Sequence, residues 1–324
     1  MTSGIAAPYP RLLGDVGGSR ARFGWIEEAG SAITAVESLR SGDHAGLEAA
    51  IARYLASLGR AQPRSCAIGI AAPVTGDVVA MTNRTWTFSI SDLQRSLGLD
   101  RILVINDYAA LAHALVGVRP DEVRRVGGGE AVANAPLGLV GPGTGLGVSG
   151  LLVAPGGGSV PVVGEGGHVS LSAADAVEDS VIAILRRRFG HVSAERALSG
   201  PGLVNLYAAS CELGGRPIEA LEPVEVTERA RLGNDAGCRQ AIDLFFAFLG
   251  SVAGDLALTL GARGGVYVAG GIVAQLGDEV TNSAFRERFE AKGRYSGYLA
   301  RIPTAVVVDA SGLALRGADA ALDA

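Results

Sequence analysis

Short apolar runs alternate with segments of helical spacing along most of the chain. In one such segment, apolar residues recur every three or four positions from Leu47 to Leu58, and Gly59 follows as a glycine suited to end a helix. The same reasoning predicts helices at 47–58, 108–115, 176–189 and 239–260, and strands at 66–71, 102–105, 266–269 and 305–308. Because strands that alternate with helices are typical of layered sheets, the pattern predicts an α/β protein.

Two segments, 12–26 and 139–153, share one pattern, in which an apolar strand leads through a glycine-rich turn into a second strand. Each turn carries a hydroxyl residue, Ser19 in the first and Thr144 in the second. Such turns expose successive backbone N–H groups with no Cβ in the way, so they can bind an anion. Two copies predict two similar domains with a cleft between them as the default site. Ordinary hairpins are the alternative.

The second of these turns also matches a dinucleotide-binding fingerprint, Gly145-x-Gly147-x-x-Gly150. That fingerprint has to open a helix, because the helix N-terminus binds the pyrophosphate. Here the apolar run 151–153 continues a strand and ends at Pro155. The context therefore excludes a Rossmann site, and with it a nicotinamide oxidoreductase becomes a remote alternative.

Composition bounds the classes of protein to consider. At 324 residues, 48% hydrophobic and 19% charged, the chain can form about two folded domains and is not disordered. Glycine accounts for 47 residues without a collagen-like period, which indicates many turns and close backbone approaches. The net charge is −5 and no segment concentrates arginine, so no nucleic-acid partner is expected.

The chain has a single lysine, Lys292, which lies between Ala291 and Gly293. A Walker A loop needs Gly-Lys-Ser/Thr, and a protein kinase needs a strand lysine on the phosphates. Neither is present. If the protein handles nucleotide phosphates, backbone N–H groups, arginine or a carboxylate-held metal must bind them.

The spacing of the cysteines and the lengths of the apolar segments indicate where in the cell the protein is located. Cys66, Cys211 and Cys238 are far apart and form no C-x-x-C, so neither disulfides nor a zinc cluster are expected. The first ten residues lack the basic and apolar regions of a signal peptide. Prolines and glycines interrupt the uncharged span 131–164, so no membrane helix is expected there. These features predict a cytoplasmic protein.

Two carboxylates lie where α/β sheets bind ligands. Asp15 lies in the first glycine-rich segment, and Asp107 directly follows an apolar strand. The alternative for Asn106 and Asp107 is that they only cap the helix starting at Tyr108. Both roles are compatible.

The segment Gly164–His168 offers one carboxylate and one imidazole, Glu165 and His168. Glu-x-x-His is a metal pair on a bundle helix, but two glycines between them would destabilise that helix by about 2 kcal/mol. A glycine-flanked loop suits hydrogen bonds to a polyol better, and a structural histidine is the alternative. Glu195, just before the segment Ser199-Gly-Pro-Gly, is a further candidate residue, and the alternative is that it is only a solvated charge at a helix end. Gly270 and Gly271 follow an apolar strand, either to admit a flat ring or as a plain strand–helix turn.

Together these segments resemble the bacterial glucokinases, and the whole chain follows that family in order and spacing. The matching motifs are Gly14-Asp15-Val16-Gly17-Gly18-Ser19, Ile105-Asn106-Asp107-Tyr108, Gly141-x-Gly143-Thr144-Gly145-Leu146-Gly147, Gly164-Glu165-Gly166-Gly167-His168, Ser199-Gly200-Pro201-Gly202 and Val268-Ala269-Gly270-Gly271-Ile272. The resemblance implies an α/β protein of the two-lobed hexokinase/actin-like (ribonuclease H-like) ATPase fold with an interlobe cleft. It implies a small domain of 1–117 plus 308–324 and a large domain of 118–307.

The resemblance also implies an activity: ATP- and Mg²⁺-dependent phosphorylation of D-glucose at O6, a step of glycolysis. Asp107 matches the catalytic base. The residues that match the sugar contacts are Asn106, Asp107, Glu165, His168 and Glu195. Asp15 matches the residue near Mg²⁺, through water. The residues that match the nucleotide contacts are Gly14, Asp15, Val16, Gly17, Gly18, Ser19, Gly143, Thr144, Gly145, Gly270 and Gly271.

The resemblance also implies a homodimer. The competing function is a non-catalytic sugar sensor of the same fold. This chain departs from the family at Arg20, where an amide is usual, and at Pro142, where a small residue is usual. Pro142 is expected to stiffen the second turn. The cysteine-rich zinc site and the DNA-binding helix pair of the related repressor–kinases are absent from the sequence.

Overall fold

The computed structural model describes residues 6–59, 62–81, 84–154 and 158–324. The chain divides into two compact units: Met1–Val118, Gly156–Val163 and Asp309–Ala324 form the first, and Arg119–Pro155 and Gly164–Val308 form the second. The sequence-based boundaries at 117/118 and 307/308 lie within a residue of two of these divisions.

A five-stranded sheet in the order β3-β2-β1-β4-β7 forms the centre of the first unit. Its strands are β1 (Arg11–Val16), β2 (Arg20–Ile26), β3 (Thr34–Arg40), β4 (Ser65–Ile70) and β7 (Arg101–Asn106). Strands β1, β2 and β3 are antiparallel neighbours, whereas β1, β4 and β7 run parallel. The carboxyl ends of β1, β4 and β7 therefore meet at one edge of the sheet.

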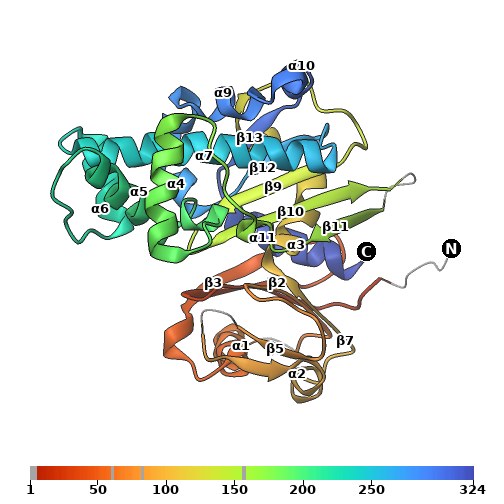
Figure 1. Ribbon diagram of the computed structural model, residues 1–324. Helices are drawn as coiled ribbons and strands as arrows, with labels where there is room; N and C mark the ends of the chain where they lie inside the picture. Colours follow the sequence, from red (N-terminus) through yellow and green to blue (C-terminus); the bar gives the residue numbers. More distant parts are fainter. Residues whose placement is uncertain (1–5, 60–61, 82–83, 155–157) are drawn as a thin grey trace. The chain divides into compact units, whose positions relative to one another are not determined.

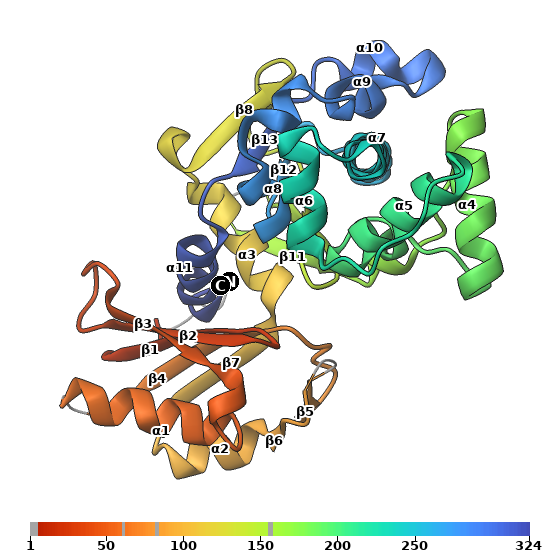
Figure 2. The same ribbon diagram turned by 90° about the vertical axis from the view of Figure 1, so that its left-hand side faces the viewer.

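Helices cover both faces of this sheet. α1 (Leu47–Leu58) lies on one face, and α3 (Asp107–Ala114) and α11 (Ala310–Leu322) lie on the other (Figures 1 and 2). The predicted end of α1 is confirmed, because Gly59 adopts a left-handed φ of 58°. The remaining elements of the unit are β5 (Val78–Ala80), β6 (Thr87–Ser89), α2 (Ile90–Ser96), β11 (Ser159–Val163) and the 3-10 turns η1 (Ser41–Asp43) and η2 (Leu115–Gly117).

A buried cation joins the first strand to the last helix. Arg11 on β1 has no exposed side-chain area and pairs with Asp319 at 2.8 Å and Asp323 at 2.7 Å on and after α11. Its guanidinium also donates to the Ala7 carbonyl at 2.8 Å and lies over the Tyr9 ring at 4.0 Å. The C-terminal helix α11 is thereby fixed to β1, the strand that also carries Asp15.

In the second unit the sheet runs β10-β9-β12-β13-β8. Its strands are β8 (Val123–Gly127), β9 (Leu137–Pro142), β10 (Leu146–Val153), β12 (Gly265–Val268) and β13 (Thr304–Val307). Its helices are α4 (Ala176–Phe189), α5 (Gly200–Leu213), α6 (Pro223–Leu232), α7 (Ala236–Leu260), α8 (Gly271–Leu276), α9 (Phe285–Glu290) and α10 (Ser296–Leu299). Its 3-10 turns are η3 (Pro120–Glu122), η4 (Gly166–His168), η5 (Ala194–Arg196), η6 (Gly277–Asn282) and η7 (Gly293–Tyr295).

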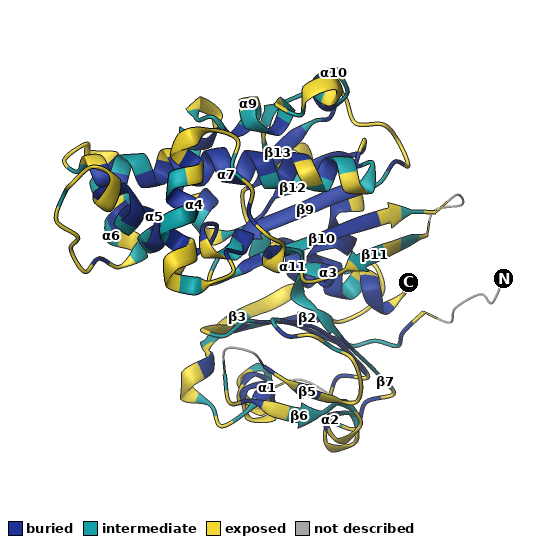
Figure 3. Ribbon diagram, viewed as in Figure 1, coloured by how far each residue is buried: buried dark blue, intermediate teal, exposed yellow. Residues whose placement is uncertain are grey.

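The long helix α7, largely coloured as buried in Figure 3, forms the core of this unit. Its Phe245, Phe246 and Phe248 are fully buried. By length and apolar composition it would qualify as a membrane-spanning helix, but 67% of its most apolar window is buried inside the protein. That burial is typical of a core helix, as its nearly continuous apolar pattern predicts.

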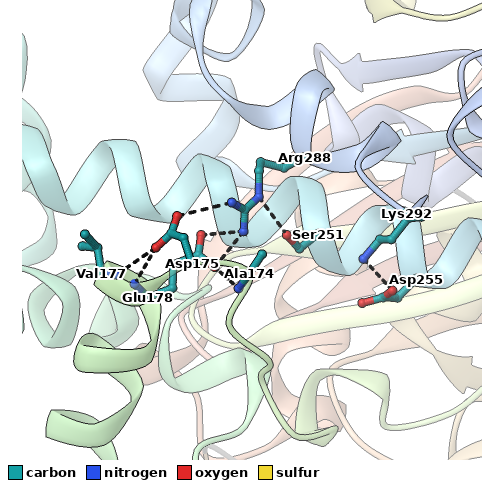
Figure 4. Close-up of polar contacts among 8 residues, drawn as sticks. All are labelled: Ala174, Asp175, Val177, Glu178, Ser251, Asp255, Arg288 and Lys292. Carbon is teal, nitrogen blue, oxygen red and sulfur yellow. Dashed lines mark hydrogen bonds and ion pairs between the residues drawn. The ribbon is translucent and has the colours of Figure 1, made fainter.

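A buried ion pair connects α4 to α9. Glu178, only 2% exposed, accepts two hydrogen bonds of 2.7 Å from Arg288, whose guanidinium also contacts Ser251 on α7 (Figure 4). Glu178 also accepts the Ala174 backbone N–H at 2.8 Å. The lone lysine, Lys292, pairs with Asp255 at 2.6 Å, farther along α7 (Figure 4). The start of α4, eight residues after His168, is thus tied to α9 through Arg288.

Candidate active site

The first glycine-rich turn joins β1 to β2 and is closed by a 2.8 Å hydrogen bond from Gly17 N–H to the Arg20 carbonyl. Its other carbonyls are also occupied. The Gly17 carbonyl accepts the Ser41 hydroxyl at 3.1 Å, and the Ser19 carbonyl accepts the Ser41 N–H at 3.0 Å. The Gly18 carbonyl accepts Nε of Arg84. Nothing in the spacing of Ser41 or Arg84 indicated these contacts.

Asp15 lies on β1, paired in register with Arg22 on β2 and with Gly69 on β4. Its carboxylate lies 3.8 Å from a guanidinium nitrogen of Arg22, and 26% of its side chain is exposed. The pKa of Asp15 is raised to about 7, because burial and then the charge of Asp107, with a smaller increase from Asp309, outweigh the lowering by Arg22. Asp15 and Asp107 therefore influence each other's charge within the first unit.

Asn106 ends β7 and caps α3. Its Oδ1 accepts the N–H groups of Tyr108 at 2.9 Å and Ala109 at 3.2 Å, and its amide nitrogen donates to the Ala72 carbonyl at 3.4 Å. The capping interpretation is thus confirmed. Asp107 is the first helical residue, one position earlier than expected, is half-buried, and accepts the Tyr108 N–H at 3.0 Å.

Two glycines that the sequence reasoning missed bring α3 close to its neighbours. A Cβ at Gly69 on β4 would lie 3.0 Å from the Ala110 Cβ and 3.4 Å from the Asp107 Cα. A Cβ at Gly317 on α11 would lie 1.7 Å from the Ala110 carbonyl oxygen. Since Asp107 begins α3, these two backbone contacts set where its carboxylate lies relative to β1 and β4.

In the second unit, the predicted strand–turn–strand segment is the antiparallel pair β9 and β10, and β10 continues through Val153, which confirms that the Gly145–Gly150 fingerprint continues a strand and does not open a helix. Gly143 N–H donates to the Gly145 carbonyl at 2.8 Å, and the Gly143 carbonyl accepts the Gly200 N–H at 2.8 Å. The exposed residue of the turn is Thr144. The start of α5 therefore supports this turn.

Glu195 lies against the same turn. Its Oε2 accepts the Leu146 backbone N–H at 2.9 Å, and a Cβ at Gly145 would lie 2.5 Å from that oxygen. Glu195 is half-buried on η5 rather than solvated at a helix end, so the interpretation as a solvated charge is wrong. Gly145 lacks a side chain because the carboxylate occupies that space.

Glu165 directly precedes the short turn η4, His168 is the last residue of that turn, and both side chains are exposed. A Cβ at Gly167 would lie 2.2 Å from the Leu146 carbonyl, and one at Gly166 would lie 2.8 Å from the Val148 Cβ. The glycines are required where η4 lies on β10. Glu165 and His168 do not lie on an α-helix, as expected.

Backbone hydrogen bonds connect η4 to η5. Ala194 N–H donates to the Val169 carbonyl and Leu171 N–H to the Val192 carbonyl, both at 2.9 Å, and Ser170 and Ser193 form a β-bridge. Glu165, His168 and Glu195 are therefore brought together beside the second glycine turn. The predicted residues of the first unit (Gly14, Asp15, Val16, Gly17, Gly18, Ser19, Asn106 and Asp107) form a separate set within that unit.

Gly270 and Gly271 mark the end of β12 and the start of α8, which confirms a strand–helix turn. A Cβ at Gly270 would lie 2.2 Å from the Pro142 carbonyl oxygen, and the Ala269 N–H donates to Val140 at 2.9 Å. Gly270 thus lies against the second glycine turn, whereas a Cβ at the exposed Gly271 would meet nothing within 4 Å. The approach of a flat ring to Gly271 stays a prediction.

Metal binding would have to rely on few protein ligands. Within the described ranges, no group of three or more His, Cys, Asp or Glu side chains could hold an ion. Mg²⁺ is commonly bound by one or two carboxylates together with water and substrate phosphates. Asp15 fits that mode, because its carboxylate is partly exposed and a neighbouring cation would offset the repulsion from Asp107.

Comparisons with known proteins agree on one family. The family model described as Glucokinase matches residues 12–324. A glucokinase of Aromatoleum aromaticum is 53% identical over 324 residues, which are 100% of this chain and 97% of that relative. A solved glucokinase from an Antarctic psychrotroph is 32% identical with a TM-score of 0.88, covering 97% of this chain and 98% of its own.

A ROK family glucokinase from Streptomyces griseus, solved in complex with glucose and AMPPNP, has a TM-score of 0.63 at 20% identity. That match covers 96% of this chain and 98% of the other. At this identity the likeness is one of fold.

Proposed function

This chain belongs to the glucokinase family and phosphorylates glucose, and from that premise we propose that it transfers the γ-phosphoryl group of Mg²⁺-ATP to O6 with Asp107 as general base. Its fold is the predicted hexokinase–actin-type ATPase fold. The relatives named glucokinase do not favour the sensor alternative. The observation that carries the assignment of the base is the position of Asp107, half-buried at the first residue of α3 and at the carboxyl edge of β7.

Asp107 accepts the proton of the 6-hydroxyl group as O6 attacks the γ-phosphorus. The new O6–P bond forms while the bond from the γ-phosphorus to the β–γ bridging oxygen breaks, and ADP leaves. The Asp107 carboxylate is suited to this role because its Oδ1 is oriented by the Tyr108 N–H, which fixes its rotamer at the start of the helix.

The remaining sugar contacts are Asn106, Glu165, His168 and Glu195. Glu165 and His168 are exposed on η4, and Glu195 presents its carboxylate from η5 beside them. Hydrogen bonds from these groups to the ring hydroxyls would discriminate against sugars that lack those hydroxyls, since the protein groups would then lose their partners.

The phosphates are bound by backbone N–H groups of the two glycine turns, Gly17–Ser19 and Gly143–Gly145. Asp15 would hold Mg²⁺ through water, and the ion would supply charge neutralisation to the polyphosphate. Support for ATP as the donor comes from the family and from the AMPPNP complex of the Streptomyces griseus glucokinase. Gly270 and Gly271 border the adenosine in this proposal.

A homodimer, a cytoplasmic location, a role in glycolysis and the lack of nucleic-acid and membrane partners stay predictions. They rest on the family resemblance, the net charge of −5 and the absence of basic clusters in the sequence.

The proposed reaction is tested by incubating the full chain with ATP, Mg²⁺ and a panel of sugars and phosphoryl donors, and by detecting products directly. We expect glucose 6-phosphate and ADP in a 1:1 ratio, with loss of the reaction when Mg²⁺ is chelated. Formation of a phosphate ester at another oxygen, or turnover that persists without a divalent ion, would refute the proposal.

A further inference from the structure

The first glycine turn is held from one side only. Its carbonyls at Gly17 and Ser19 accept hydrogen bonds from Ser41, and its Gly18 carbonyl accepts one from Arg84. In a trans peptide the C=O and the following N–H point in opposite directions. The N–H groups of Gly18 and Ser19 therefore face away from Ser41 and Arg84. This arrangement is an anion nest whose orientation depends on those two residues.

The segment that carries Arg84 is anchored to the segment that carries Ser41. Met81 N–H donates to the Trp86 carbonyl at 3.0 Å, which closes the connection between β5 and β6, and the buried Trp86 ring donates to the His44 carbonyl at 3.3 Å. His44 directly follows η1, which begins at Ser41. Both groups that hold the glycine turn thus belong to one packed assembly.

The Arg84 guanidinium lies beside Gly42 of η1. A Cβ at Gly42 would be in ordinary van der Waals contact with its two terminal nitrogens, at 3.5 Å and 3.6 Å. The guanidinium therefore lies between the first glycine turn and η1.

The charge of Arg84 is not neutralised by a carboxylate within ion-pair distance among the described residues. By contrast, Arg22 lies beside Asp15 at 3.8 Å, and Lys292 pairs with Asp255 in the other unit. Phosphoryl transfer demands charge neutralisation, and this chain has no lysine in the first unit. Arg84 places a cation at the turn itself.

We propose that Arg84 is a positioning residue for the phosphoryl donor: it orients the Gly17–Ser19 turn through the Gly18 carbonyl and adds a positive charge beside it. This inference rests on the proposed role of that turn in phosphate binding. It assigns to Arg84 a function in nucleotide affinity that no sequence motif indicated.

The test compares Arg84→Gln with Arg84→Lys in the full chain, with steady-state kinetics for both substrates. Loss of one charge-assisted hydrogen bond is expected to raise the KM for ATP about tenfold in Arg84→Gln. The KM for glucose is expected to stay within about twofold, because the sugar contacts are not touched. Arg84→Lys keeps the cation and a donor, so it should recover most of the ATP affinity.

The matched control is Arg53→Gln, on α1 of the same unit, where the arginine is 53% exposed and 3.8 Å from Glu37. It is expected to leave both KM values unchanged. Thermal unfolding and glucose binding without nucleotide verify that each variant is folded.

Two results would overturn the inference: an ATP KM within about twofold of the unmodified chain in Arg84→Gln, or equal rises for ATP and glucose, which indicate general distortion. If Arg84→Gln does not fold, Arg84→Met, which also removes the charge and the donor, decides in its place: a rise confined to the KM for ATP supports the inference, and an ATP KM within about twofold of the unmodified chain or equal rises for both substrates overturn it. If the unmodified chain did not use ATP at all, the proposed function itself would fail, and that result is separate.

Discussion

Glu195 Oε2 accepts the backbone N–H of Leu146 at 2.9 Å, directly after the second glycine turn. A proposed sugar contact therefore touches the turn proposed to bind phosphate. One oxygen of this carboxylate is thus engaged by the backbone, which fixes the position of the side chain beside the turn.

Replacing Gly145 with alanine tests this contact. The new Cβ would lie 2.5 Å from Glu195 Oε2, so the carboxylate must move. We expect the dissociation constant for glucose, measured by calorimetry without nucleotide, to rise at least about tenfold.

Gly143→Ala is the matched control in the same turn, because its Cβ would meet nothing within 4 Å. Its glucose affinity should change by less than about twofold. Equal losses of glucose affinity in the two variants would show that the Glu195 contact is not what positions the sugar site.

The buried pair Glu178–Arg288 should contribute strongly to stability. Glu178→Gln leaves the Arg288 guanidinium, 13% exposed, with only the more distant carboxylate of Asp175, which is 3.5 Å away and 52% exposed. We expect the free energy of unfolding to fall by about 3 kcal/mol in chemical denaturation.

Lys292→Met breaks the neighbouring pair with Asp255, whose side chain is 55% exposed, and should cost less than about 1 kcal/mol. A cost for Glu178→Gln as small as that of Lys292→Met would contradict the structural role assigned to the pair.

The contact between Arg11 and Asp323 predicts a pH dependence of stability. Burial alone would raise the pKa of Asp323, but hydrogen bonds from Arg11 and the Ala7 N–H, together with the charges of Arg11 and Arg101, lower it overall. A carboxylate with a lowered pKa stabilises the fold above its unfolded pKa, and this contribution is lost as the pH falls through the folded value.

Asp323→Asn should therefore lower the free energy of unfolding at pH 7 by about 1 kcal/mol, a modest value because Asp323 is 39% exposed and Asp319 still pairs with Arg11. The difference should shrink below about pH 4. Asp100→Asn, in an exposed pair with Arg64, should show little effect at any pH. A difference for Asp323→Asn that grows on acidification would contradict the assignment.

The sequence predicted the elements that follow from local periodicity. The bounds of α1 and α4 agree with the spacing of apolar residues, and both glycine-rich segments form antiparallel strand pairs. These features depend on residues close together in the chain.

Contacts between distant segments could not be predicted. Arg84 reaches Gly18 and Gly317 meets Ala110 only because the sheet and helices bring them together. For Glu195, the sequence spacing favoured a solvated charge. Its role as acceptor of the Leu146 N–H arises from the contact between η5 and β10, which lie far apart in the sequence. The motifs identified the candidate residues, but they did not predict the contacts that hold these residues in position.

The most direct test of the proposed mechanism is the turnover of Asp107→Asn, measured as glucose 6-phosphate formation, alongside glucose binding by calorimetry. Asparagine keeps the shape of the side chain and removes its basicity. We predict that glucose binding is retained and that kcat falls at least about 10²-fold, the lower range for loss of a general base. A variant that turns over at nearly the normal rate would contradict the assignment of Asp107 as the base.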